Sequence, residues 1–178
     1  MKPEWETTVQ CGLKTLVPTG KCWVLYAGDP EEAREAALET ANRLCNGKSE
    51  PEGWNRPNIR RIRFREGMTH EEFVKKIVEG GPEFCAWSSE NPSKMIFVLE
   101  DIDRADVFHV FGELLPSPND RVYESRFGSR VMDINDDWFI GPDLVYFIAT
   151  MDASRADKLP QEGFLDRFVV LRPEQAGP

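Results

Sequence analysis

VLYAGDPEEARE, residues 24–35, joins an apolar run to a helical pattern through one short turn. The apolar run 22–27 predicts a short buried strand, and the alanine-rich pattern 30–45 predicts a helix. Asp29 has the place of an N-cap, because its carboxylate can accept from backbone N–H groups of the first turn, and Pro30 loses no needed donor. Glu32 can complete an arrangement like a capping box. This stretch therefore predicts a strand, a tight turn and a helix that caps itself.

A phosphate-binding loop of the pattern GxxxxGK[ST] occupies the same kind of turn in nucleotide-binding proteins. Counted from Gly28, the second Gly is replaced by Ala33, the Lys by Arg34 and the hydroxyl residue by Glu35. The acids of this stretch, Asp29 and Glu35 among them, would meet a triphosphate with like charge. Each close pair costs about 3 to 4 kcal/mol at an effective dielectric near 20. The nucleotide-binding positions to test, Gly28, Asp29, Ala33, Arg34 and Glu35, thus form a degenerate phosphate loop.

Composition predicts one ordinary globular domain. The chain has 178 residues, 40% apolar content and a net charge of −9, which disfavours broad contact of this domain with nucleic acid. No apolar run approaches the roughly 18 residues of a membrane span, and the start lacks a signal peptide, so we expect a cytoplasmic protein with no membrane partner. The four cysteines form no CxxC pair and are expected to be buried free thiols.

Apolar runs alternate with helical patterns along the chain, which predicts an α/β fold with helices on both faces of a mostly parallel sheet. The runs 22–27, 95–99 and 144–149 are expected to be neighbouring parallel strands. The arginine-rich run 59–65 alternates with apolar residues, which favours a strand with one solvated face over a nucleic-acid patch. Thr69 begins a capping box for a helix through about Val78. The segment 116–142 predicts a hairpin-like insertion.

A second motif follows the apolar run that ends at Leu99. Glu100 and Asp101 come directly after it. Nucleoside triphosphatases use two such acids to hold Mg²⁺ and to orient the attacking water. Two acids are also common at an ordinary solvated strand end, so the pair by itself leaves both interpretations open.

Four strings in order carry a family resemblance: RIRFREGMTHEEFVKKI (61–77), EDIDRADVFHVFGELL (100–115), WFIGPDLVYFIATMD (138–152) and GFLDRF (163–168). Together they resemble the ATPase core of McrB-like AAA+ proteins, the GTP-driven motor subunits of modification-dependent restriction systems. MoxR-type AAA+ proteins are a looser match. The resemblance spans about residues 20–172. It implies a single three-layer α/β/α core of the P-loop NTPase fold over residues 1–178.

The resemblance also implies which residues belong to the site. Glu100 stands at the Walker B Asp and is the candidate Mg²⁺ position, while Asp101 stands at the catalytic Glu. Asp152 replaces the sensor 1 Asn, which puts a charge where a neutral amide positions water. Arg167 matches an arginine before the final Phe, and Asp166 replaces its neighbour. Asp101, Asp152 and Arg167 are therefore the candidate catalytic residues of a site that departs from the family pattern.

These departures predict that hydrolysis has lapsed. The sequence ends soon after Arg172, so we expect that the C-terminal helical lid of AAA+ proteins is missing from this chain or was cut away. The favoured hypothesis is a degenerate domain without a cofactor, a structural or regulatory interaction module for a protein partner. That partner would be an active AAA+ subunit or a second copy of the chain. The alternative is an AAA+ NTPase that binds GTP or ATP with Mg²⁺ through an atypical loop, in a restriction or defence-type motor complex.

Overall fold

The structure is a computed structural model and describes residues 3–16, 23–46, 59–78, 94–112, 132–134, 137–139, 144–160, 164–165 and 168–173. Its elements in chain order are α1 (Pro3–Leu16), β1 (Trp23–Gly28), α2 (Pro30–Asn46), β2 (Ile59–Arg63), α3 (His70–Val78), β3 (Lys94–Glu100), the 3-10 helix η2 (Ile102–Arg104), α5 (Val107–Phe111), β4 (Met132–Ile134), β5 (Asp137–Phe139), β6 (Leu144–Asp152), the 3-10 helix η4 (Ala153–Lys158) and β7 (Phe168–Leu171).

The central sheet has five strands in the order β2-β3-β6-β1-β7, and all of its pairs are parallel. β6 lies between β1 and β3, which confirms the three predicted neighbouring strands. Gly28 pairs with Asp152 and Arg63 pairs with Glu100, so all four residues lie at the carboxyl edge of the sheet. β4 and β5 form a separate antiparallel pair within the predicted insertion. The remainder of segment 116–142 lies outside the described residues.

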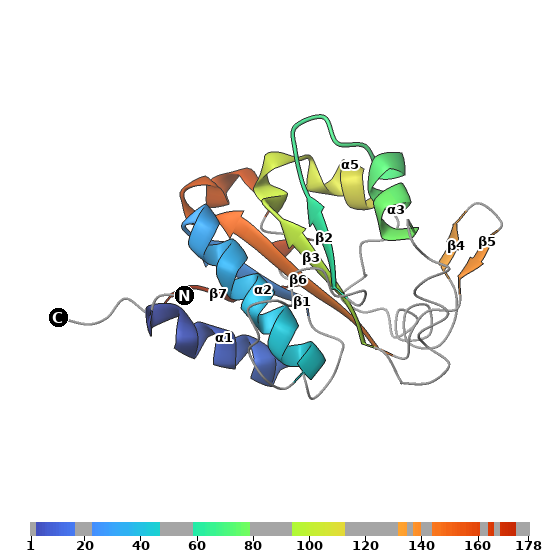
Figure 1. The fold of residues 1–178 in the computed structure, drawn as a ribbon. Helices are drawn as coiled ribbons and strands as arrows, with labels where there is room; N and C mark the ends of the chain where they lie inside the picture. The colour runs from blue at the N-terminus through green and yellow to red at the C-terminus, as the bar shows by residue number, and fades with distance from the viewer. Residues whose placement is uncertain are drawn as a thin grey trace.

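Helices cover both faces of the sheet (Figure 1). α1 and α2 pack on one face, where they contact β1, and α3 and α5 lie on the other. Successive residues of each central strand enter opposite layers: Val24 and Tyr26 belong to the α1–α2 layer, whereas Leu25 belongs to the α3–α5 layer. The strands are apolar throughout because both of their faces are buried. Within the described residues, no helix is both long and apolar enough to cross a membrane.

α1 and β7 were not among the elements predicted from the sequence. α1 comes close to β1 at Gly12, where a Cβ atom would clash with the hydroxyl oxygen of Tyr26. That hydroxyl shares a buried hydrogen bond with Thr40 of α2 at 2.6 Å, and burial raises the pKa of Tyr26. The prediction that the cysteines are buried is wrong for Cys11, which is an exposed free thiol on the outer side of α1. The other cysteine side chains lie outside the described residues.

An ion pair between Glu6 of α1 and Arg43 of α2 joins the two helices, with nitrogen–oxygen distances of 2.6 and 2.9 Å. The hydrogen bonds from Arg43 lower the pKa of Glu6 from 4.5 to about 2. The pair therefore adds stability above the unfolded-state pKa and loses it as the pH falls toward 2. Because the Glu6 side chain is 47% exposed, solvent screening limits the contribution to at most about 1 kcal/mol.

We expect Glu6→Gln to lower the free energy of unfolding at pH 7 by less than about 1 kcal/mol. The difference from wild type should shrink by more than half by about pH 3, because the wild-type carboxylate binds protons on unfolding there. Urea unfolding of both proteins at the two pH values measures this difference in the free energy of unfolding. A difference that is equal at pH 7 and pH 3 would show that the Glu6 charge is not its source.

Candidate functional site

The turn between β1 and α2 contains one residue, because the strand ends at Gly28 and the helix begins at Pro30. Asp29 Oδ1 accepts hydrogen bonds from the backbone N–H groups of Glu31 at 3.0 Å and Glu32 at 3.2 Å. The backbone oxygen of Asp29 accepts from the N–H of Ala33 at 2.8 Å. These contacts confirm the N-cap prediction. The three amides best placed for a bound phosphate are engaged by Asp29.

Gly28 lacks a side chain because it packs against another residue, not because a phosphate must approach it. A Cβ atom on it would lie 2.6 Å from Cζ2 of Trp5, so the indole of α1 lies directly against this residue. The indole Nε1 donates to the Glu32 carboxylate at 3.0 Å, which fixes the ring over the start of α2. Ala33 is fully buried between α2 and the sheet, and Glu35 is exposed on the helix. The β1–α2 turn is therefore packed against α1.

Replacing the cap residue tests this account of the turn. We expect Asp29→Ala to lower the free energy of unfolding by about 1 kcal/mol, because two backbone donors lose their acceptor. Asp29→Asn is the matched control and should cost less, since Asn is also a good N-cap. Urea denaturation followed by circular dichroism gives both values. An Ala variant as stable as wild type would show that the carboxylate does not stabilise the helix.

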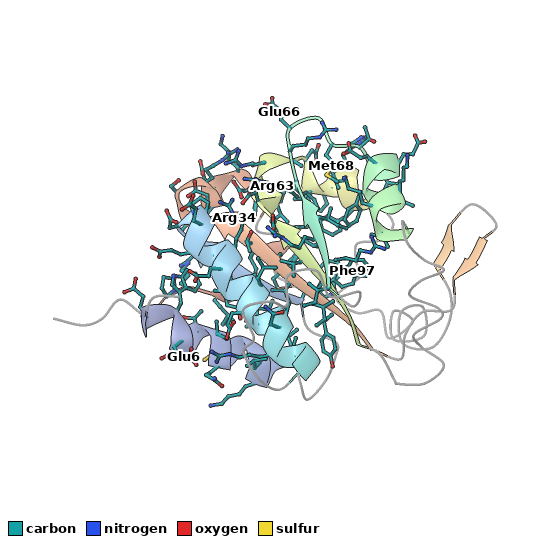
Figure 2. All side chains as sticks on the ribbon, viewed as in Figure 1. Glu6, Arg34, Arg63, Glu66, Met68 and Phe97 are labelled. Carbon is teal, nitrogen blue, oxygen red and sulfur yellow. The ribbon has the colours of Figure 1, made fainter. Side chains whose placement is uncertain are left out.

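Arg34 and Asp101 are joined by an ion pair in which one guanidinium nitrogen contacts both carboxylate oxygens. Arg34 is in the first turns of α2, and its Nη1 atom lies 2.9 and 3.0 Å from the two carboxylate oxygens of Asp101. The Asp101 side chain is 3% exposed and is also contacted by Arg63 Nε at 3.1 Å and Arg104 Nε at 3.7 Å. Figure 2 shows Arg34 on α2 and Arg63 on β2 at the same edge of the sheet. Three guanidinium groups thus surround one buried carboxylate.

The backbone holds Asp101 in an uncommon conformation. Its φ of 57° and ψ of 46° are left-handed, and it is the only residue other than glycine with positive φ in the described part of the chain. Asp and Asn adopt this region more readily than other side chains. The Asp101 N–H donates to Thr150 Oγ1 of β6 at 3.0 Å in a buried bond. This turn after β3 directs the carboxylate toward the start of α2.

Glu100 is also matched by an arginine. Its side chain is 3% exposed, and Oε1 lies 2.6 Å from Nε of Arg61 on the neighbouring strand β2. Mg²⁺ prefers several oxygen ligands with retained waters. Within the described residues, no group of three or more His, Cys, Asp or Glu side chains is arranged to hold a metal ion. The arginine-paired carboxylates of Glu100 and Asp101 do not fit a Mg²⁺ ion in this arrangement.

Asp152 ends β6 and begins η4. Its carboxylate accepts from the N–H of Ser154 at 2.8 Å and from the Ser154 hydroxyl at 2.7 Å, and these bonds lower the pKa of Asp152. The N–H of Asp152 donates to the buried Asp103 carboxylate at 3.2 Å. Asp103 is paired in turn with Arg155 at 3.2 Å. Asp152, which the family resemblance places at the sensor 1 position, therefore acts as the N-cap of η4.

The structure brings several predicted site residues to one edge: Gly28, Asp29, Arg34, Glu100, Asp101 and Asp152. Arg167 lies outside the described residues, so its role stays a prediction. Sequence reasoning missed the basic partners Arg61, Arg63 and Arg104. The signal was present in the alternating arginines of 59–65, which were correctly assigned to a solvated strand face. What was not recognised is that this exposed face of β2 ends beside Glu100 and Asp101, the two acids at the end of β3.

Comparisons with known proteins agree with the fold. No family model matches the chain. The chain is 25% identical, over 162 residues and 84% of its length, to the Type IV methyl-directed restriction enzyme EcoKMcrB subunit of Escherichia coli strain K12. It spans about a third, 34%, of the length of that relative.

A solved structure supports the same fold. The crystal structure of a DNA polymerase III gamma subunit-related protein from Thermotoga maritima superposes with a TM-score of 0.56 at 14% identity, over 93% of this chain and 45% of that one. At this identity the likeness concerns the fold. The similarity in sequence to the McrB subunit and the shared parallel-sheet fold support a McrB-like AAA+ domain with the P-loop NTPase fold.

Proposed function

We propose that this AAA+ domain is an interaction module that does not hydrolyse nucleotide efficiently. The observation that carries the proposal is the ion pair between Arg34 and the buried carboxylate of Asp101. In a phosphate-binding loop the Lys at the Arg34 position reaches the β- and γ-phosphates. Here the equivalent cation is bonded to the residue aligned with the catalytic acid. Cation and acid therefore satisfy each other.

The cost of opening this arrangement supports the proposal. A nucleotide at the β1–α2 turn would displace the Asp29 cap, at about 1 kcal/mol. It would also separate Arg34 from the buried Asp101 carboxylate, which would keep its contacts with Arg63 and Arg104. This step therefore costs less than the roughly 3 kcal/mol of leaving a buried charge uncompensated. Both costs weaken nucleotide binding at this turn.

The partner we propose is a protein. The McrB relative is by its printed name a subunit of a restriction enzyme, and this chain matches about a third of it. We propose that the present domain likewise acts within an assembly in the cytoplasm, beside an active AAA+ subunit or a second copy of itself. Its contribution is then a folded surface that needs no bound nucleotide to be stable.

Calorimetric titration with Mg²⁺-GTP and Mg²⁺-ATP tests the proposal. Wild type should give no binding isotherm at millimolar nucleotide. The matched variant Glu31→Gly, Ala33→Gly, Arg34→Lys and Glu35→Thr restores the phosphate-loop pattern, removes two acids and replaces the guanidinium that contacts Asp101. We expect this variant to bind nucleotide and still hydrolyse it poorly, because Asp152 is unchanged. Binding by wild type at micromolar nucleotide would overturn the proposal.

One observation favours the alternative of a nucleotide-binding NTPase that uses GTP or ATP with Mg²⁺. Glu100, Asp101 and Asp152 converge on the same edge of the sheet as the start of α2. That is the placement a nucleotide site in a restriction or defence-type motor complex would use. This alternative requires Arg34 to leave Asp101 when nucleotide binds, so it predicts saturable binding by the unmodified protein.

A further inference from the structure

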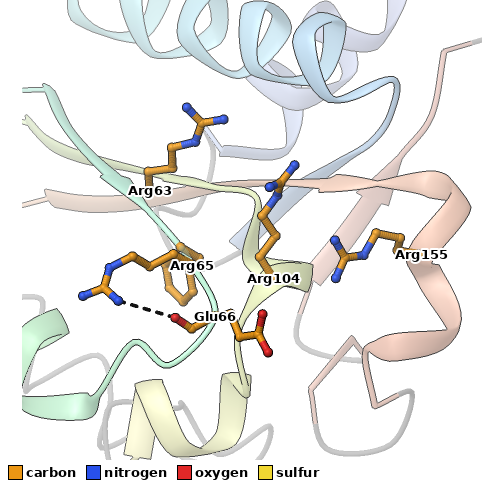
Figure 3. Close-up of a pocket in the computed structure, with 6 residues that line it drawn as sticks. Arg63, Arg65, Glu66, Arg104 and Arg155 are labelled. Atoms are coloured by element: carbon orange, nitrogen blue, oxygen red, sulfur yellow. Dashed lines mark hydrogen bonds between the residues drawn. The ribbon is translucent and has the colours of Figure 1, made fainter.

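A pocket of about 300 Å³ opens at the carboxyl edge of the sheet, beside the charge cluster described above. It is lined by Arg63, Phe64, Arg65, Glu66, Arg104 and Arg155, which come from the end of β2 and the turn after it, from η2 and from η4 (Figure 3). Among the described residues, neither the β1–α2 turn nor Arg34 contributes to this lining. The pocket is therefore separate from the phosphate-loop position.

Buried carboxylates hold three of the arginines in place. Arg63 and Arg104 contact Asp101 through Nε, and these are the contacts they make within the described part of the chain. Arg155 contacts Asp103 through Nε at 3.2 Å and its backbone oxygen through Nη2 at 3.3 Å. The remaining terminal guanidinium nitrogens can donate into the pocket.

The lining of the pocket itself is basic, because it holds four arginines and one acid, Glu66. Arg65 is paired with Glu72 at 2.6 Å and Arg155 with Asp103 at 3.2 Å. Arg63 and Arg104 share the single carboxylate of Asp101 with Arg34. Glu66 and Asp152, whose charge Arg104 and Arg155 stabilise, balance the two cations left over. The cations of the lining that have no carboxylate to themselves are therefore Arg63 and Arg104.

We propose that this pocket binds the phosphate group of a small phosphorylated molecule. Guanidinium groups bind phosphate and carboxylate oxygens in paired, parallel hydrogen bonds. A terminal phosphate carries close to two negative charges at neutral pH, whereas a carboxylate carries one, so a phosphate is attracted more strongly to the arginines of the lining. A volume of about 300 Å³ is at the lower end of small-ligand pockets. A net charge of −9 opposes a long nucleic-acid contact.

Calorimetric titration of the whole chain with inorganic phosphate and pyrophosphate, at constant ionic strength in chloride buffer, tests the proposal. Both should bind wild type. Arg104→Gln should weaken the dissociation constant about tenfold, since it removes a charged donor from the pocket. Glu66→Gln should tighten binding, because it removes the acid in the lining. Arg172→Gln, an exposed arginine that does not line the pocket, is the matched control and should leave binding unchanged.

Several results would overturn the proposal that this pocket binds phosphate. Absence of phosphate and pyrophosphate binding would do so, as would equal weakening by Arg104→Gln and Arg172→Gln, which would indicate general charge attraction. Glu66→Gln keeps the test informative if Arg104→Gln is unstable, because its expected effect has the opposite sign. If single-stranded DNA or an acidic peptide binds while pyrophosphate does not, the ligand of the pocket is a macromolecule and not a small phosphorylated molecule. Phosphate binding here and nucleotide binding at the β1–α2 turn are measured in separate titrations, so either proposal can fail while the other stands.

Discussion

Replacing Asp101 by Asn is expected to lower the free energy of unfolding by about 3 kcal/mol, the lower end of the range for breaking a buried ion pair. The side chain is 3% exposed, and the neutral amide would leave Arg34 without its counter-charge. Arg63 and Arg104 reach solvent and can be hydrated, which keeps the loss at that lower end. Asn tolerates the left-handed backbone of this position, so the variant removes the charge without adding strain. Urea unfolding at pH 7 measures the change.

Asp157→Asn is the control for that variant. Asp157 is an exposed acid of η4, so the same chemical change should alter stability by less than about 0.5 kcal/mol. An Asp101→Asn variant that costs less than about 1 kcal/mol would show that the three arginines do not depend on this carboxylate. The interpretation that Asp101 compensates the charges of Arg34, Arg63 and Arg104 would then be wrong.

Replacing Trp5 by Ala is expected to cost about 3 to 5 kcal/mol, the range for deleting a large buried aromatic side chain. Trp5 is 1% exposed, lies 6.0 Å from the Tyr26 ring between centroids, and donates to Glu32. Its loss would leave a cavity over Gly28 and free the start of α2. Thermal and urea unfolding followed by circular dichroism give the size of the effect.

Trp5→Phe separates packing from hydrogen bonding, because it keeps a ring over Gly28 and removes the Nε1 donor to Glu32. We expect it to cost clearly less than Trp5→Ala. If Trp5→Ala and Trp5→Phe are equally destabilised, the hydrogen bond rather than the packing of α1 holds the turn. If neither is destabilised, α1 does not stabilise the β1–α2 turn.

The fold was predictable where the sequence pattern is local. The apolar runs fixed β1, β3 and β6, since a strand buried on both faces needs no partner to be recognised. Asp29 and Thr69 marked the starts of α2 and α3, and both act as caps, Thr69 by accepting from the N–H of Glu72 at 3.2 Å. α1 was not predicted, although its buried residues Trp5, Val9, Gly12 and Leu16 recur at helical spacing. What the sequence does not indicate is where α1 docks, because the close approach of Gly12 to Tyr26 joins distant residues.

The site was predictable in its parts but not in its pairing. Family resemblance located Arg34 and Asp101, yet nothing in either motif states that one binds the other. Their contact depends on the left-handed turn at Asp101, which Thr150 holds from a third strand. Arg63 was similarly visible only as an exposed strand residue. Its role follows from the register that places β2 beside the end of β3.

The melting temperature of the unmodified protein, with and without millimolar Mg²⁺-GTP or Mg²⁺-ATP, tests the central claim most directly. A nucleotide present at about 100 times its dissociation constant would stabilise the fold by about 2.7 kcal/mol. For a chain of this size that is an upward shift of about 5 to 10 °C. If Asp29 caps the helix and Arg34 neutralises Asp101 as described, neither nucleotide shifts the melting temperature measurably. A clear upward shift with either one would contradict the account, because the Asp29 cap and the Arg34–Asp101 pair would then yield to phosphate.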